Sequence, residues 1–220
     1  MATEIAQTAL PPIVSREEWQ AARAALLIKE KAHTRAKDVI SAERRRLPMV
    51  EVDASYRFDG ANGEVSLLDL FEGRQQLIIQ HFMFHPDWEK GCPGCTGSVN
   101  DIGTVAPLHE ADVTFALVSR APRAKLEPYR KEHGWDFPWY SSFGSTFNKD
   151  FNVTGDEDNE IPGLSFFLRD GAKVFHTYST TGRGVEPVLV SYGFLDMTAY
   201  GRQEDWEDSP AGWPQKPTYG

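Results

Sequence analysis

The sequence predicts an α/β protein with a central mixed sheet flanked by helices. Two apolar runs, at residues 77–84 and 112–119, lack a polar face, which is typical of buried parallel strands. A hairpin signal at 164–178 adds antiparallel pairing, and segments of helical character separate these strands. With 220 residues, 40% of them apolar, the chain is long enough for one well-packed domain with additional segments.

The first predicted element is a helix that begins at Ser15. Ser15 and Glu18 have the spacing of a capping box, in which each side chain accepts a hydrogen bond from the backbone of the other. Good helix formers follow until Leu47 and Pro48 end the segment. We expect one long helix or two shorter ones there, and short strands with tight turns after Met49.

From residue 66 onward, helical segments and longer strands are expected. A helical turn is expected at 66–71, and the buried strand at 77–84 should end at His85 and Pro86. The second buried strand, at 112–119, follows after a segment that could be helical. Two parallel strands joined by a helix are the repeating unit of α/β folds.

The second half of the domain continues this alternation. A helix should begin near Pro122 and end at Gly134, which fits a C-terminal cap. Two strands, at 164–168 and 173–178, are separated by residues with hairpin-turn chemistry. A last helix is expected over about 185–195.

Three regions follow from this pattern. Residues 1–48 form an N-terminal leader and helical extension, and residues 49–196 form the sheet domain. Residues 197–220 contain Trp206, Trp213 and three prolines in an acidic setting, so we expect an irregular tail that lies on a surface.

Composition excludes several classes of function. The formal net charge of −9 gives the chain no general attraction to nucleic acid or to anionic membranes. No run of eighteen apolar residues is present, and the first ten residues lack the basic start and apolar core of a signal peptide. We therefore expect a cytoplasmic protein that binds neither nucleic acid nor membrane.

Cys92 and Cys95 carry most of the functional prediction. Two cysteines cannot form a disulfide scaffold, and a close pair in an intracellular chain indicates redox or metal chemistry. The pair follows a buried strand and precedes a possible helix, where Pro93 suits the first helical position. Unpaired N–H groups at a helix N-terminus favour a thiolate. We predict Cys92 as the nucleophile and Cys95 as the resolving thiol.

Two other interpretations of the cysteines remain open. His81, His85, Cys92 and Cys95 offer two nitrogens and two sulfurs at spacings found in zinc sites. However, His81 lies inside a predicted strand and His85 at or beyond its end, so the four side chains should point in different directions. We therefore predict no metal site and no cofactor. The remaining alternative is two buried cysteines without chemistry.

The chain resembles the uncharacterised bacterial proteins catalogued as domain of unknown function 899. The resemblance spans most of the chain, and its signature stretches are HFMF at 81–84, DWEKGCPGC at 87–95, VSRAP at 118–122, GWDFPW at 134–139, GLS at 163–165 and VFHTYS at 174–179. The resemblance implies a thioredoxin-like fold and the activity of a dithiol–disulfide oxidoreductase.

A wider similarity is to thioredoxin-fold proteins, including peroxiredoxins. The stretch FHP at 84–86 followed by Cys92 is similar to the peroxiredoxin approach to its peroxide-attacking cysteine. Glu89 stands where peroxiredoxins place Thr or Ser, while Cys95 favours dithiol exchange. The similarity also implies that Pro162 lies where these proteins hold a cis proline beside the disulfide. An X–Pro bond can adopt either isomer, so the sequence leaves the state of the Ile161–Pro162 bond open.

Four more residues are candidates for supporting roles. His81 and His85 could tune the thiolate or relay protons, or could be hydrogen-bonded in the core. Trp88 could shield the site or line a substrate groove, and Arg120, just past the second buried strand, could stabilise a thiolate.

We predict a thiol–disulfide oxidoreductase whose partners are a disulfide-containing protein or small molecule and a cellular reductant. The alternatives are a peroxiredoxin-like peroxidase that uses Cys92, and a non-enzymatic module, possibly zinc-binding, on the same scaffold. The exposed sheet edges and the acidic tail would permit a homodimer.

Overall fold

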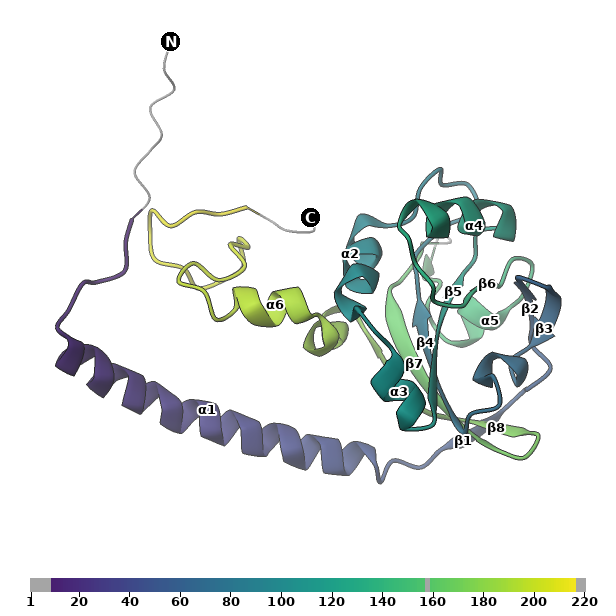
Figure 1. Ribbon diagram of the computed structural model, residues 1–220, viewed down its shortest axis with the longest axis horizontal. Coiled ribbons are helices and arrows are strands. Elements are labelled where there is room, and N and C mark those ends of the chain that lie inside the picture. Colours follow the sequence, from purple (N-terminus) through teal and green to yellow (C-terminus); the bar gives the residue numbers. More distant parts are fainter. Residues whose placement is uncertain (1–8, 157–158, 217–220) are drawn as a thin grey trace, which may run out of the picture. The chain divides into compact units, whose positions relative to one another are not determined.

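The computed structural model describes residues 9–156 and 159–216, which form two compact units. One unit comprises Pro48–Val190 and contains the sheet (Figure 1). The other combines Met1–Leu47 with Ser191–Gly220.

The sheet unit is built on eight hydrogen-bonded strands in the order β1-β8-β7-β4-β5-β6-β2-β3. Strand β4 pairs in parallel with β5 and antiparallel with β7, so the predicted central mixed sheet is confirmed. The strands are β1 (Val50–Val52), β2 (Arg57–Gly60), β3 (Gly63–Ser66), β4 (Gln76–His81), β5 (Val113–Ser119), β6 (Trp139–Ser141), β7 (Gly163–Asp170) and β8 (Lys173–Thr181).

Helices cover both faces of this sheet, as the sequence predicts (Figure 1). Helices α2 (Pro93–Ile102) and α3 (Ala106–Glu110) connect β4 to β5, and α4 (Arg123–Glu132) connects β5 to β6. Side chains of α2 and α4 join one apolar cluster, whereas η1 (Asp69–Phe71) and α5 (Phe147–Asp150) contribute to a second cluster. Because side chains alternate along a strand, β4 contributes to both clusters.

Strand β4 ends three residues earlier than the sequence predicts. The apolar run continues to Phe84, and Phe82 still donates a backbone hydrogen bond to Val118 (2.9 Å). However, β7 begins at Gly163, opposite His81, so the ladder on that side has no partner beyond this pair. Phe82 and Phe84 are therefore apolar because they are buried, although the pairing of β4 with β7 ends at His81.

The helix expected over about 185–195 is also interrupted. A 3₁₀ helix, η3, covers Gly182–Val188 and includes Pro187. Leu189 then adopts an extended conformation (φ −90°, ψ 104°) before α6 (Val190–Leu195) begins. Proline lacks a backbone N–H and restricts the helical hydrogen-bond pattern, which accounts for the break.

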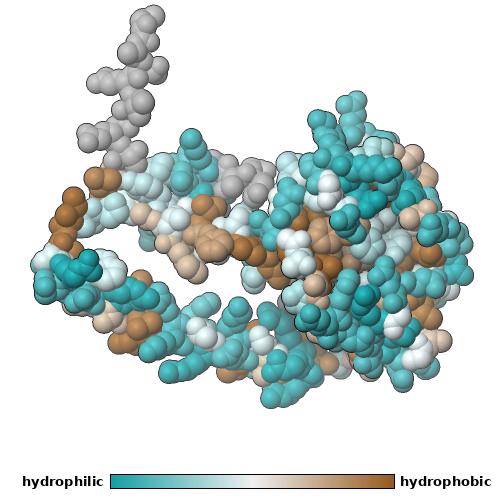
Figure 2. All heavy atoms as spheres, viewed as in Figure 1, coloured by the Kyte–Doolittle hydropathy of each residue, from teal (hydrophilic) through white to brown (hydrophobic). Residues whose placement is uncertain are grey.

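In the other unit, α1 extends over Arg16–Arg44 as one continuous helix of 29 residues. The predicted capping box is confirmed: Glu18 N donates to Ser15 Oγ (3.2 Å), and Ser15 N donates to Glu18 Oε2 (2.9 Å). No residue of α1 is buried, and apolar side chains alternate with hydrophilic ones along it in Figure 2. No helix within residues 9–156 and 159–216 combines the length and the apolar character of a membrane span.

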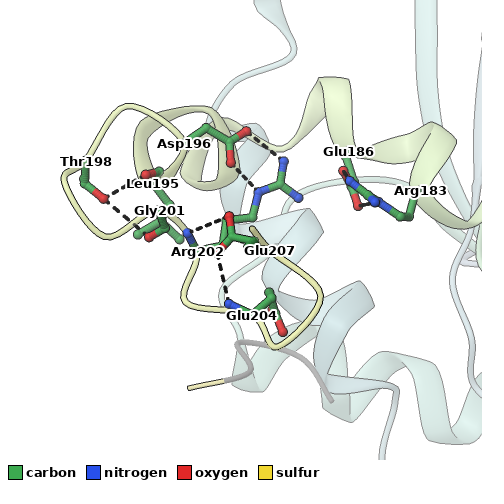
Figure 3. A network of polar contacts seen from close by, with 9 residues as sticks. All are labelled: Arg183, Glu186, Leu195, Asp196, Thr198, Gly201, Arg202, Glu204 and Glu207. Carbon is green, nitrogen blue, oxygen red and sulfur yellow. Dashed lines mark hydrogen bonds and ion pairs between the residues drawn. The ribbon is translucent and has the colours of Figure 1, made fainter. Parts of the chain in front are cut away.

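The C-terminal segment has an irregular backbone, as predicted, with turns and bends after α6. Polar contacts nevertheless hold it together (Figure 3). Arg202 binds Asp196 through two nitrogens, at 2.7 Å and 2.8 Å, which is the bidentate geometry preferred by a guanidinium and a carboxylate.

Candidate functional site

The cysteine pair lies at the N-terminus of α2, which follows a loop after β4. Cys92 is the N-cap residue (φ −58°, ψ 130°), and Pro93 occupies the first turn, where its missing N–H has no intrahelical partner. The backbone N–H of Cys92 donates to the carbonyl of Met83 at 3.0 Å. The loop therefore holds the first cysteine against the segment that leaves the sheet.

The sulfur of Cys92 is surrounded by hydrogen-bond donors. The Cys95 side chain donates to it, and the backbone N–H groups of Cys95 and Gly94 also do so. These donors outweigh the opposing effect of partial burial and lower the pKa of Cys92 to about 6. Cys92 is half-buried, so a thiolate can form at neutral pH and still meet a reactant.

Cys95 has the opposite electrostatic character. Its side chain is buried, and its thiol donates a hydrogen bond to Cys92, which raises the pKa of Cys95. Burial and the negative charges of Cys92 and Glu160 raise this pKa further, whereas a hydrogen bond from the Met83 backbone has a smaller, lowering effect. Both cysteines are reduced, and the proton stays on the buried one.

Glu160 is the functional candidate that sequence reasoning missed. Its side chain is 2% exposed and forms an ion pair with Arg120, whose side chain is 17% exposed, at 3.2 Å. The sequence offered Arg120 as a charge that could stabilise a thiolate, and the structure pairs it with a carboxylate that acts on Cys95. A signal was present, because Glu160 directly precedes the Ile161–Pro162 dipeptide that the resemblance places beside the cysteines.

Ile161–Pro162 leads directly into β7. None of the described peptide bonds is cis, so the bond before Pro162 is trans. Ile161 N donates to Val153 O at 3.0 Å, and the next residue, Gly163, pairs with His81 at the end of β4. Pro162 is thus next to the strand end from which the cysteine loop departs.

An aromatic cluster supports the loop before Cys92. A side chain at Gly91 would place its Cβ only 2.6 Å from Cε1 of Phe82, so the backbone lies directly on this ring. Phe82 contacts Tyr129 and Trp139, with ring centroids 6.2 Å and 4.8 Å away. The Tyr129 hydroxyl is 2.9 Å from Oγ1 of Thr96 in the first turn of α2.

His85 and Trp88 lie in the loop between β4 and α2. Nδ1 of His85 accepts a hydrogen bond from the Asp87 backbone at 3.1 Å, and the His85 and Trp88 ring centroids are 6.1 Å apart. The Trp88 side chain is exposed, while its carbonyl and that of Pro86 accept hydrogen bonds from the Lys125 ammonium group. Lys125 therefore fixes the loop on α4 and leaves the indole available to a partner.

His81 lies on the other face of β4. Its ring is buried among aromatic residues, 5.8 Å from the Phe147 ring, and Nε2 is 2.8 Å from Ser165 Oγ. Burial, with a smaller contribution from the charge of His176, lowers the pKa of His81 to about 3, so the ring is neutral. The preceding residue, Gln80, instead faces α2, where its Nε2 donates to Ser98.

The zinc geometry considered from the sequence is therefore not present. His81 faces away from α2, while the cysteines and His85 lie beyond the end of the strand. In the part of the chain that the structure describes, no group of three or more His, Cys, Asp or Glu residues is placed to hold a metal ion.

The family described as "Bacterial protein of unknown function (DUF899)" matches residues 8–219. No curated protein matches the sequence. Similar solved structures include a variant of Xanthomonas campestris peroxiredoxin Q, with 15% identity, a TM-score of 0.49, and coverage of 67% of this chain and 98% of that one. Peroxidoxin BcpB from Mycobacterium tuberculosis has 17% identity, a TM-score of 0.47, and coverage of 66% and 96%. MTB DsbF has 16% identity, a TM-score of 0.41, and coverage of 63% and 95%.

Proposed function

We propose that this chain, which belongs to the DUF899 family of bacterial proteins, exchanges thiols and disulfides through Cys92 and Cys95. The observation that carries the proposal is that the two sulfurs at one helix N-terminus differ in pKa and in exposure. Cys92 has a pKa of about 6 and partial exposure, while Cys95 is buried and stays protonated. One sulfur is suited to attack a substrate, and the other to remain in reserve.

The reaction proceeds in two exchanges. The Cys92 thiolate attacks one sulfur of a substrate disulfide, whose S–S bond breaks as the other sulfur leaves as a thiolate and takes up a proton. Cys95 then loses its proton and attacks the sulfur of Cys92 in the mixed disulfide, which releases the second substrate thiol. The substrate gains two electrons and two protons, and the protein is left with a Cys92–Cys95 disulfide.

The surroundings of Cys95 support this order of events. While Cys92 is a thiolate, its charge and its hydrogen bond keep the Cys95 proton in place. Formation of the mixed disulfide removes that negative charge, so the pKa of Cys95 falls at the stage when Cys95 must attack. The carboxylate of Glu160 remains nearby, paired with Arg120.

We also propose the setting of the reaction. The substrate is a disulfide in a protein or a small molecule, and a cellular dithiol reductant regenerates the reduced pair in the cytoplasm. Trp88, exposed beside the cysteine loop, offers an apolar contact for that substrate.

A single-turnover experiment tests the proposal. The reduced native protein is mixed with a disulfide-bonded peptide, and the products are followed by mass spectrometry. We expect two peptide thiols and an internal disulfide from the native protein, and a trapped mixed disulfide at Cys92 from Cys95→Ser. Cys92→Ser should react at least about a thousandfold more slowly, because the nucleophile is absent. Equal rates for all three proteins would contradict the proposal.

Hydrogen peroxide provides the second arm of the same experiment. Rapid oxidation by a stoichiometric amount of peroxide, together with slow reaction with the peptide disulfide, would assign Cys92 to a peroxidase instead. Oxidation at the rate of an ordinary free thiol would exclude that alternative.

A further inference from the structure

A concave site lies in the C-terminal segment, within the unit that contains no cysteine. It is an open cavity of about 360 Å³ formed within residues 200–213. This volume is at the lower end of the range for small-molecule sites, about 300–1,000 Å³. Its lining includes the aromatic side chains Tyr200, Trp206 and Trp213 and the acidic residues Glu207 and Asp208, and it contains no Lys, Arg or His.

The aromatic rings form walls at a right angle. The rings of Tyr200 and Trp213 are 5.2 Å apart between centroids, and their planes are inclined by 88°. Trp206 also lines the cavity and is 52% exposed. The face of an aromatic ring carries negative charge density, so rings around a cavity attract a cation.

The carboxylate of Glu207, one of the lining residues, is held by two backbone N–H groups, as Figure 3 shows. Oε1 accepts a hydrogen bond from Arg202 N at 3.3 Å, and Oε2 accepts one from Glu204 N at 3.1 Å. Gly201 has φ +63°, and a Cβ there would lie 2.9 Å from Oε1. The left-handed backbone at this position favours glycine, and the carboxylate lies close to the backbone.

Arg202 lies beside the lining residues, and Asp196 pairs its positive charge. Its guanidinium forms the bidentate pair with Asp196 and lies 4.2 Å from the centroid of the Tyr192 ring. It is 5.9 Å from the centroid of Trp206, so it also contacts that indole. Because Asp196 balances its charge, the two carboxylates that line the cavity remain uncompensated by a basic lining residue.

The cavity is also held in shape before any ligand binds. The Tyr200 hydroxyl donates to the carbonyl of Ala9 at 3.1 Å, and Ala9 N donates to Gly212 O at 3.4 Å. Trp213 N donates to Pro210 O at 3.2 Å. Fixed walls reduce the ordering cost of binding.

We propose that this cavity binds an organic cation of the quaternary ammonium class. A quaternary ammonium donates no hydrogen bonds, and it gains from aromatic faces and from the negative charge of Glu207 and Asp208. The cation is either a free small molecule or a trimethylated lysine side chain.

Isothermal titration calorimetry with choline chloride tests this inference in the full-length protein, against sodium chloride at equal ionic strength. The matched control is 3,3-dimethylbutan-1-ol, which has the shape of choline without its charge. We expect saturable choline binding, and binding of the neutral alcohol that is at least about tenfold weaker. A peptide with trimethyllysine completes the series: tighter binding than choline identifies a protein side chain, and weaker binding identifies a free molecule.

Two tryptophan variants locate the site. Trp206→Ala should weaken choline binding by about tenfold, because it removes one aromatic wall. Trp19→Ala should leave it unchanged, since Trp19 lies on α1 and is exposed to a similar extent, 54% against 52%. Both side chains are exposed, and circular dichroism verifies that the variants fold. Absence of choline binding, equal binding of the neutral alcohol, or equal loss in both variants would overturn the proposal. Neither variant alters the cysteines, so this outcome is independent of the disulfide assay.

Discussion

The titratable groups on the two sides of β4 differ in whether their surroundings favour the charged or the neutral form. On the face toward α5, His81 is buried with one short hydrogen bond, and its pKa of about 3 leaves it uncharged. Beyond the strand end, on the side of α2, Cys92 is surrounded by three donors, and its pKa of about 6 favours the charged form. Both pKa values are lowered, yet one group loses its charge and the other gains one.

The difference shows that burial alone does not determine reactivity. Desolvation disfavours the charged form of any group, and only donors directed at that group can reverse the preference. The N-terminus of α2 supplies such donors to Cys92, whereas His81 has aromatic neighbours and a serine hydroxyl. Residues close in sequence can therefore have unrelated roles on the two faces of one strand.

The largest expected effect concerns His81 and acid. Its pKa is about 3 in the folded protein and near 6.5 in the unfolded chain, so the unfolded chain takes up a proton first as the pH falls. The stability that is present above pH 6.5 is then lost at about 1.4 kcal/mol per pH unit toward pH 3. Urea unfolding between pH 7 and pH 4 measures this slope.

His81→Leu is the matched variant for this measurement. Leucine fills similar space without titrating, and Ser165 keeps its contact with Ser179 at 2.8 Å. As the pH falls, the free energy of unfolding should decrease more steeply for the native protein than for the variant. Equal slopes would show that the folded protein does not lower the pKa of His81, and would contradict the difference between the two faces of β4.

The next effect tests the donors around Cys92. Cys95→Ala removes the strongest of them, so the pKa of Cys92 should rise toward its ordinary value. At pH 7 the thiolate fraction, and with it the rate of alkylation by iodoacetamide, should fall by up to about thirtyfold. Cys95→Ser retains a hydroxyl donor and should lose less. Similar rates in the two variants would mean that the hydrogen bond does not control Cys92.

The smallest effect concerns Glu160, whose charge is the weakest of the influences on Cys95. Glu160→Gln should lower the pKa of Cys95, because a negative charge that opposes thiolate formation is removed. The second exchange, in which Cys95 attacks the mixed disulfide and releases the second peptide thiol, measures this change, because its pH dependence should shift to lower pH in Glu160→Gln. Glu64→Gln, on an exposed residue of β3, provides a control that should leave this pH dependence unaltered. The same pH dependence in all three proteins would separate Glu160 from the site.

Local pattern was enough to predict the frame of the site. The apolar runs predicted β4 and β5, and the strand-to-helix position of the Cys-Pro-Gly-Cys stretch predicted an N-terminal cysteine on α2. These features depend on burial and on residues a few positions apart, which a sequence displays directly.

Contacts between residues far apart in the sequence could not be predicted in this way. Glu160 is sixty-five positions from Cys95, and its approach depends on how β7 pairs with β4. The pairing of Arg120 with Glu160 follows from the same register. The end of β4 at His81 was likewise set by the start of β7 rather than by the composition of residues 82–84.

Gly91 has a consequence for protein engineering. The loop before Cys92 lies so close to the Phe82 ring that no larger residue fits at position 91. A redesign of the Cys-Pro-Gly-Cys stretch, or its transfer to another protein, should therefore keep this glycine together with the ring of Phe82.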